Sequence, residues 1–137
     1  MNEGTAIVID DDPFFCNMLT DILKELSLKV VSYSSPEAFF SEQSSNDSPL
    51  ALRCPEFILT DNQMPGMTGL DFLIQIKEMG CTLPAQRIAI ISGRWDVINM
   101  EKAEALGCQI FDKYNSPEKI QAWIKEVRNH SGLTSAE

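Results

Sequence analysis

The chain has 137 residues, 44% of them hydrophobic, and its 11 basic and 20 acidic residues give a formal net charge of −9. This length allows one domain with a proper hydrophobic core and is too short for two comfortable ones. The negative charge would repel the phosphate backbone of a nucleic acid, so we expect no direct binding to DNA or RNA.

The sequence carries no signal for export or for membrane insertion. No apolar run approaches the ~20 residues that span a bilayer, and the first residues lack the basic start and the apolar stretch of a signal peptide. The four cysteines have the spacing of neither a zinc site nor a secreted disulfide framework: Cys16, Cys54, Cys81 and Cys108. We therefore expect a cytoplasmic protein with reduced thiols and no membrane insertion.

Strands and helices are predicted to alternate along the chain. Five short apolar runs, mostly β-branched or aromatic, predict strands over residues 5–9, 29–33, 56–60, 87–91 and 108–112. The segments between and after them have apolar residues at intervals of three and four, which is typical of amphipathic helices. The predicted buried face of the first helix consists of Phe14, Phe15, Met18, Leu19, Ile22, Leu23 and Leu26, and that of the last consists of Ile120, Trp123, Ile124 and Val127.

Capping residues mark the predicted helix ends. The pairs Asp12-Pro13, Ser35-Pro36 and Ser116-Pro117 each place a side-chain oxygen acceptor before a proline at the first helical position. Gly80 and Gly107 are typical helix stops. We therefore interpret Asp12 as a helix cap rather than as a metal ligand.

The alternation predicts an α/β fold, because each crossover between parallel strands needs a helix's length of chain. We expect a doubly wound, five-stranded parallel sheet with helices on both faces, which strands that are apolar throughout would fit. The domain should cover residues 1–130, with 131–137 as a flexible tail or linker stub. The polar stretch 41–55 predicts a mobile surface loop.

Polar residues follow the predicted strands at the edge where such sheets bind ligands. They are Asp10, Asp11, Asp12, Asp61, Ser92, Gly93 and Lys113. Converging carboxylates would raise one another's pKa unless a cation lay among them, and oxygen ligands without paired His or Cys select a hard cation such as Mg²⁺. Because Mg²⁺ usually also takes a phosphate oxygen, we predict a site that handles phosphoryl groups, with Lys113 and Ser92 on the phosphoryl oxygens.

Four motifs in this order, "IVIDDDPFF", "ILTDNQMPGMTG", "IAIISG" and "IFDK", resemble the receiver domain of bacterial two-component response regulators, including the chemotaxis response regulators. The resemblance covers residues 5 to about 130. It implies a flavodoxin-like sheet with strand order 2-1-3-4-5. It also implies that Asp61 is the phosphoacceptor and that Mg²⁺ is bound by Asp10, Asp11, Asp61 and the backbone carbonyl of Gln63.

The same resemblance assigns roles to two further residues and to partners. Ser92 takes the position of the hydroxyl that follows the phosphoryl group on activation, and Lys113 takes that of the lysine that contacts it. A histidine kinase or phosphotransfer protein would donate the phosphoryl group, and a downstream protein would bind the switched face. The domain would not be an enzyme beyond self-catalysed phosphotransfer and autodephosphorylation. Pro65, Gly66 and Gly69 predict a loop that turns past the metal without crowding it.

The sequence departs from the family at two positions. Tyr114 follows Lys113 where the family usually has a proline in a cis peptide bond, and Ile110 lies where a Tyr or Phe commonly couples to the hydroxyl residue. Trp95 or Phe111 could substitute for that ring. Trp95 is also expected to be exposed and to contact a partner, and Arg94 to tune access of water to the phosphoryl group.

Two alternative functions remain open from the sequence. The Asp-x-Asp pattern after the first strand also occurs in phosphatases of the haloacid dehalogenase type, with Asp10 as nucleophile, although the chain is short for that class and lacks the later acidic pair. The second alternative is an adaptor that keeps the fold and does not need phosphorylation, a hypothesis motivated by Ile110 and Tyr114. The complete set of site residues favours the phosphoacceptor over the adaptor.

Overall fold

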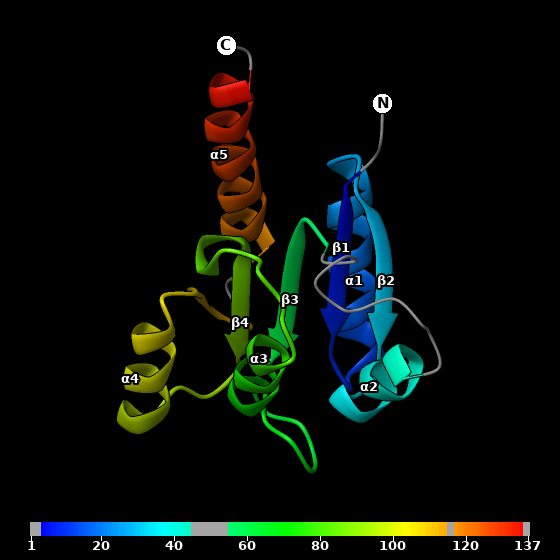
Figure 1. Cartoon of the computed structure of the whole chain (residues 1–137), viewed down its shortest axis with the longest axis vertical. Coiled ribbons are helices and arrows are strands. Elements are labelled where there is room, and N and C mark those ends of the chain that lie inside the picture. The colour runs from blue at the N-terminus through cyan, green and yellow to red at the C-terminus, as the bar shows by residue number, and fades with distance from the viewer. Residues whose placement is uncertain (1–3, 45–54, 115–116, 136–137) are drawn as a thin grey trace.

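The computed structural model describes residues 4–44, 55–114 and 117–135, and in these residues strands and helices alternate (Figure 1). The strands are β1 (Thr5–Ile9), β2 (Lys29–Tyr33), β3 (Phe57–Asp61), β4 (Ile88–Ser92) and β5 (Gln109–Asp112). The helices are α1 (Pro13–Glu25), α2 (Pro36–Ser44), α3 (Gly69–Glu78), α4 (Val97–Leu106) and α5 (Pro117–Ser135), with a short 3₁₀ helix, η2 (Ala85–Arg87), before β4. No helix within the described residues is long and apolar enough to cross a membrane.

The strands form one parallel sheet in the order β2-β1-β3-β4-β5, which confirms the predicted fold class and strand order. Because all neighbours are parallel, the carboxyl ends of the strands meet at one edge, the lower edge of the sheet in Figure 1. β3 and β4 each lie one residue later than predicted. Asp61 pairs with Ile91 and Ser92 pairs with Asp112, so both polar residues are the last residues of their strands rather than the first residues after them.

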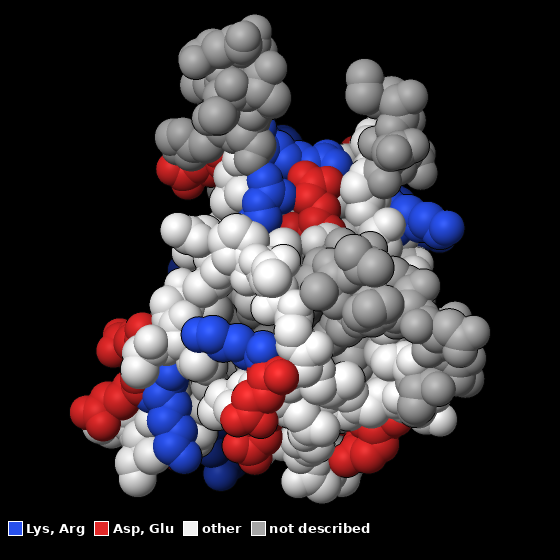
Figure 2. Space-filling model, in the orientation of Figure 1, with Lys and Arg blue, Asp and Glu red and all other residues white. Residues whose placement is uncertain are grey.

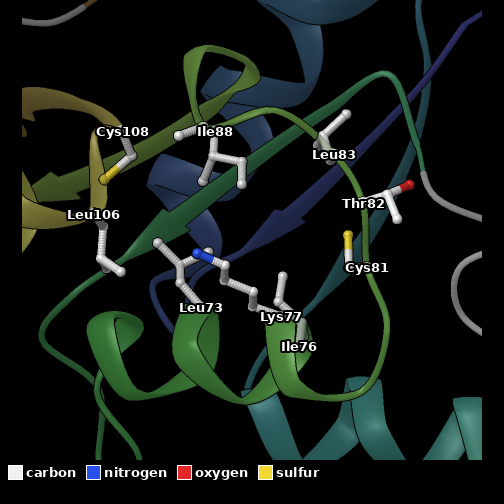
Figure 3. Close-up of a pocket in the computed structure, with 10 residues that line it drawn as sticks. Leu73, Ile76, Lys77, Cys81, Thr82, Leu83, Ile88, Leu106 and Cys108 are labelled. Atoms are coloured by element: carbon white, nitrogen blue, oxygen red, sulfur yellow. The ribbon is translucent and has the colours of Figure 1, made fainter.

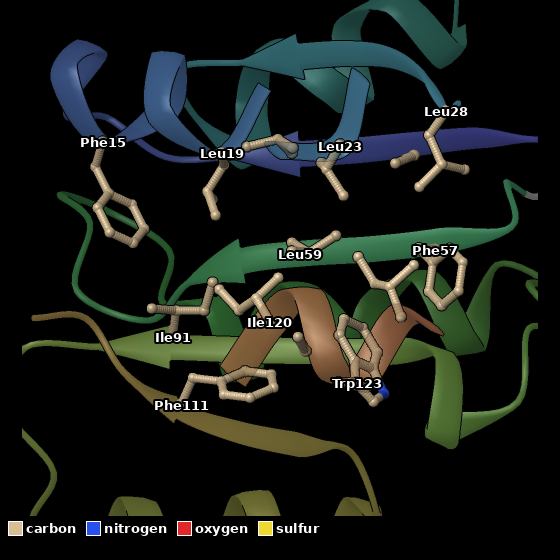
Figure 4. Packing of buried hydrophobic residues seen from close by; sticks show 14 residues of the cluster. Phe15, Leu19, Leu23, Leu28, Phe57, Leu59, Ile91, Phe111, Ile120 and Trp123 are labelled. Carbon is tan, nitrogen blue, oxygen red and sulfur yellow. The ribbon is translucent and has the colours of Figure 1, made fainter. Parts of the chain in front are cut away.

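Each face of the sheet carries its own hydrophobic core. Successive side chains of a strand point to opposite faces, so Ala6 and Val8 pack under α1 and α5, whereas Ile7 and Ile9 pack under α2, α3 and α4. Figure 4 shows the first of these cores, where Phe15, Leu19 and Leu23 of α1 and Ile120 and Trp123 of α5 pack over the same face of the sheet. Burial on both faces explains why the strands are apolar throughout.

The predicted helix caps are confirmed where the structure describes them. The Asp12 carboxylate accepts hydrogen bonds from the backbone amides of Phe14 (3.0 Å) and Phe15 (3.5 Å), and Ser35 Oγ accepts from Ala38 N (3.0 Å). Gly107 caps the end of α4 in the left-handed region, with φ of 80°. Ser116 lies outside the described residues.

Three details differ from the predictions. Phe14 is 83% exposed, because neighbouring helical residues are rotated by about 100° and Phe15 takes the position that faces the sheet. Residues 41–44 belong to α2 rather than to a loop, and residues 45–54 of the predicted loop lie outside the described residues. α5 continues to Ser135, beyond residue 131, where the predicted tail starts, and the end of the domain at residue 130 stays a prediction.

Candidate functional site

Three carboxylates meet at the carboxyl edge of the sheet, as the sequence predicts. Asp10 and Asp11 follow β1, and Asp61 ends the neighbouring strand β3. One oxygen from each carboxylate lies within 4.8 Å of the others. Asp10 and Asp61 are each only 3% exposed, whereas Asp11 faces solvent. The cluster is therefore buried on one side and open on the other.

Lys113 joins this cluster from the loop after β5. Its Nζ lies 3.1 Å from Asp61 Oδ2 and 3.4 Å from Asp10 Oδ1, and its side chain is 12% exposed. The same Nζ lies 4.9 Å from the centroid of the Phe15 ring, a cation–π arrangement that the sequence did not predict. Burial opposes the charged form of Lys113, but its interactions with Asp61 and Asp10 outweigh burial and raise its pKa.

Burial also raises the pKa values of the two buried carboxyl groups, Asp10 and Asp61. It raises the pKa of Asp10 from 3.8 to about 6, against the opposing hydrogen bond from Asp12 N (2.8 Å) and the attraction of Lys113. It likewise raises the pKa of Asp61, whose Oδ1 accepts a hydrogen bond from Gln63 N (3.0 Å). The site thus holds two buried carboxylates whose ionised forms lack full compensation by the protein.

The residues at this site fit a divalent cation. Asp10 Oδ2 is buried and has no hydrogen-bond partner among the described residues, which is a costly arrangement for a carboxylate oxygen unless a cation contacts it. Three carboxylates face a single ammonium group, so negative charge is in excess. All the available ligands are oxygens, which suit Mg²⁺. The acidic cluster is typical of the Mg²⁺ site of receiver domains.

The loop after Asp61 is held by main-chain and amide hydrogen bonds. Asn62 N donates to Ile91 O (2.9 Å), and Asn62 Oδ1 accepts from Leu70 N (3.0 Å). Gly66 has φ of 85°, as a sharp turn requires. At Gly69 a Cβ would lie 2.4 Å from Asp61 O. The glycine therefore leaves room for the strand end that carries Asp61, and its predicted role beside a metal stays a prediction.

Ser92 reaches the edge of the site but its hydroxyl is engaged elsewhere. The residue is fully buried, and Oγ donates to Arg94 O (2.9 Å) and accepts from Arg94 N (3.2 Å). Ser92 O accepts from Lys113 N (2.9 Å), which ties β4 to the loop that carries the lysine. For Gln63 the structure gives an amide contact with Asp61, and the role of its carbonyl as a metal ligand stays a prediction.

The residues where the sequence departs from the family surround this loop. Trp95 is half-buried rather than exposed, because its ring packs in the second core and its Nε1 donates to Phe111 O (3.0 Å). Ile110 is half-buried beside that core, and Tyr114 is 78% exposed. The described residues contain no cis peptide bond, so the bond between Lys113 and Tyr114 is trans.

An apolar hollow lies away from the carboxylate cluster. It measures about 200 Å³ and is bounded by α3, the segment before β4 and the start of β5, where Leu73, Ile76 and Ile88 make it largely apolar (Figure 3). Its lining contains no carboxylate, and it opens near the amino end of β4, whereas Asp61 lies at the carboxyl edge. We therefore place the functional site at the carboxylate cluster and not in this hollow.

Comparison with known proteins agrees with this assignment. A family model described as the response regulator receiver domain matches residues 6–125. The response regulator protein TmoT of Ectopseudomonas mendocina is 28% identical over 126 residues, which are 92% of this chain and 52% of that protein. TodT of Pseudomonas putida is 31% identical over 121 residues, 88% of this chain and 48% of that protein. The chain thus spans about half the length of these curated relatives.

Solved structures share the fold. A response regulator receiver domain protein from Clostridium thermocellum superposes with a TM-score of 0.75 at 21% identity, covering 96% of this chain and 98% of that one. The family match spans all five strands apart from Thr5, the first residue of β1, and it includes Asp10, Asp61 and Lys113. The chain therefore belongs to the response regulator receiver domain family of two-component systems, whose members are signalling phosphoacceptor modules rather than enzymes in the ordinary sense.

Proposed function

We propose that Asp61 accepts a phosphoryl group from the phosphohistidine of a histidine kinase or phosphotransfer protein. One observation carries this proposal: the buried Asp61 carboxylate lies 3.1 Å from Lys113 Nζ and within 4.8 Å of Asp10 and Asp11 oxygens. An Asp61 oxygen would form the new bond to phosphorus while the bond from phosphorus to the imidazole nitrogen breaks. The imidazole keeps that electron pair and takes up a proton.

The surrounding residues would make this transfer possible. Asp10, Asp11, Asp61 and the Gln63 carbonyl would hold Mg²⁺, which supplies positive charge to the phosphoryl oxygens. Lys113 would keep its ammonium close to Asp61 and contact a phosphoryl oxygen there. The extra negative charge on Asp61 would then change the balance between two arrangements of the loops at this edge.

Partners and location follow from the same proposal. The phosphorylated domain would bind a downstream protein through the face that the loops alter. We infer that this takes place in the cytoplasm, where thiols stay reduced; in the described residues Cys16, Cys81 and Cys108 form no disulfide, and Cys54 lies outside them. Figure 2 shows basic and acidic side chains interspersed over the described part of the face in view, and direct binding to nucleic acid is not part of the proposal.

The alternative functions fare differently. The phosphatase alternative, with Asp10 as nucleophile, is wrong, because the family match assigns the chain to a signalling module. The adaptor alternative is an outcome of the test below. The buried and unpaired Asp10 Oδ2 favours the phosphoacceptor, since an adaptor would have no need for this costly arrangement.

Intact-protein mass spectrometry after incubation with acetyl phosphate and Mg²⁺ tests the proposal. We expect one phosphoryl adduct on the wild-type chain, none without Mg²⁺ and none on Asp61→Asn. Asp12→Asn is a matched control, because it also removes a carboxylate near the site while asparagine still caps α1; it should keep the adduct. A folded wild type that binds Mg²⁺ but takes no adduct would support the adaptor instead.

A further inference from the structure

The loop between β4 and α4 is short and fixed at both ends. At its start, the Ser92 hydroxyl donates its only proton to Arg94 O and accepts a hydrogen bond from Arg94 N. A hydroxyl bound in this way cannot also donate to a phosphoryl oxygen on Asp61. Phosphorylation can therefore recruit the Ser92 hydroxyl only at the expense of its hydrogen bonds to the Arg94 backbone.

Trp95 fixes the other end of that turn. Its indole N–H donates to Phe111 O (3.0 Å) across 16 positions of sequence, and its ring packs among the partly buried side chains of the second core. Immediately afterwards, Asp96 caps α4 by accepting from Asn99 N (2.7 Å). Only Gly93 and Arg94 lie between the two fixed points, so the position of Trp95 restricts where the Arg94 carbonyl can go.

We propose that Trp95 is a positioning residue that holds the turn from Ser92 to Arg94 in its unphosphorylated arrangement. The inference rests on the proposed function of Asp61 and adds a restraint to it. The hydrogen bond from the indole to β5 keeps the Arg94 backbone beside Ser92 Oγ. The Arg94 carbonyl therefore competes with the phosphoryl group for the hydrogen bond that the hydroxyl donates. Trp95 thereby opposes the switch. Where the family commonly has a mobile Tyr or Phe ring, this chain has Ile110, and the fixed indole of Trp95 takes over the control of the hydroxyl.

The Trp95→Phe variant tests this restraint, because phenylalanine keeps a six-membered aromatic ring and removes the N–H donor together with the rest of the five-membered ring. With Mg²⁺ present, we expect beryllofluoride, a phosphoryl mimic, to bind this variant about threefold to tenfold more tightly than the wild type. The ratio of bound to free beryllofluoride can be measured by ¹⁹F NMR, which does not depend on either tryptophan. An unchanged or weaker affinity would overturn the inference.

Trp123→Phe is the matched control. The Trp123 indole also donates to a backbone carbonyl, Gln86 O (2.9 Å), and its ring is likewise packed in a core, but on the other face of the sheet and beside η2 (Figure 4). The variant loses a comparable hydrogen bond and a comparable part of an aromatic side chain. It should therefore lose similar thermal stability and keep the wild-type affinity for beryllofluoride.

A double-mutant comparison separates positioning from general loosening. Because Trp95 is proposed to act through Ser92, the gain in beryllofluoride affinity from Trp95→Phe should disappear when Ser92→Ala is also present. A gain that persists without the hydroxyl would contradict the proposed route. A wild type that binds no beryllofluoride would instead contradict the function proposed for Asp61.

Fluorescence offers a test that does not require Trp95→Phe to fold. The chain has two tryptophans, so Trp123→Phe leaves Trp95 as the only one. Opening of the turn should alter the surroundings of its indole, and we expect its emission to change as beryllofluoride saturates the site. Constant emission at saturation would contradict the restraint.

Discussion

Gly69 shows how one missing side chain positions the phosphoacceptor. It is the first residue of α3, it is buried, and its amide donates to Asn62 O (3.2 Å). A Cβ on this residue would lie 2.4 Å from Asp61 O and 3.0 Å from Asn62 Cα, both of which belong to the main chain and cannot rotate away. The helix start can therefore approach the end of β3 only without a side chain at this residue.

Gly69→Ala should consequently destabilise the domain. Alanine favours a helix by up to about 1 kcal/mol, but forcing its methyl group against a main chain that cannot rotate away costs about 2–3 kcal/mol, so we expect a net loss of about 1–2 kcal/mol. Urea unfolding followed by circular dichroism measures this loss. Acetyl phosphate should also label the variant more slowly, because Asp61 is displaced.

Gly93→Ala is the comparison for this prediction. Its Cβ would lie 2.9 Å from Tyr114 Cε2, but that tyrosine is 78% exposed and its ring can turn away. Its free energy of unfolding should change by less than about 0.5 kcal/mol. If Gly69→Ala proved as stable as Gly93→Ala, the close approach to Asp61 would not constrain the fold.

The helices on the first face are held together by one ionic network at the amino end of the sheet. Glu56, just before β3, pairs with Arg128 of α5 (3.1 Å) and with Arg87 of η2 (3.3 Å). Arg128 also donates to Leu26 O at the end of α1. Burial opposes the ionised form of Glu56, but the two arginines outweigh burial and lower its pKa. The network thus joins α1, α5 and the sheet.

Glu56→Gln should loosen this junction. Removing the shared carboxylate charge abolishes the ion pairs that Glu56 makes with Arg87 and Arg128, whose side chains are only 19% and 30% exposed. We expect a loss of about 1–2 kcal/mol in the free energy of unfolding, measured by urea titration. Glu101→Gln, an exposed position on α4, removes the same charge and should have almost no effect. Equal stability of the two variants would show that the network adds nothing.

Across the domain, strand order explains where the charges gather. The chain leaves β1 for β2 on one side and continues to β3 on the other, so the crevice between the ends of β1 and β3 is the point where the order reverses. The topology delivers Asp10, Asp11 and Asp61 to this point from adjacent strands. Folding therefore brings like charges together and makes the stability of the domain depend on pH and on cations.

The sign of this pH dependence follows from Asp10. Its pKa is about 6 in the folded chain and 3.8 ordinarily, so between these values the metal-free folded state binds the proton more tightly than the unfolded state. Relative to Asp10→Asn, the free energy of unfolding of the wild type should fall by about 2–3 kcal/mol as the pH rises from about 4 to about 7. Urea titrations at several pH values in a chelator measure this difference.

Cation binding and a surface control complete this prediction. At pH 7, Mg²⁺ should raise the stability of the wild type and leave Asp10→Asn nearly unchanged, since the cation favours only the site with its carboxylate. Asp21→Asn, an exposed position on α1, should follow the wild type at every pH. A wild type whose stability relative to Asp10→Asn is flat across this range would show that burial does not penalise the Asp10 carboxylate.

Much of this molecule can be predicted from local sequence. Apolar runs, helical spacing and capping residues depend on near neighbours in the chain, and they predicted the five strands and the caps at Asp12 and Gly107. Because parallel strands end at a common edge, the same patterns also predicted that Asp10, Asp61 and Lys113 would meet. These contacts follow from the order of the elements and need no knowledge of detailed packing.

Other features depend on atoms that are distant in the sequence. The Phe14 ring is exposed because α1 turns Phe15 toward the sheet, and the indole N–H of Trp95 donates a hydrogen bond to the Phe111 carbonyl on β5. The hydroxyl of Ser92 faces Arg94 rather than Asp61 in this arrangement. No local pattern encodes such contacts, because each depends on how two elements pack and on the room between them. The sequence thus predicts which groups gather at the carboxyl edge, and packing in three dimensions sets which of them are free to act.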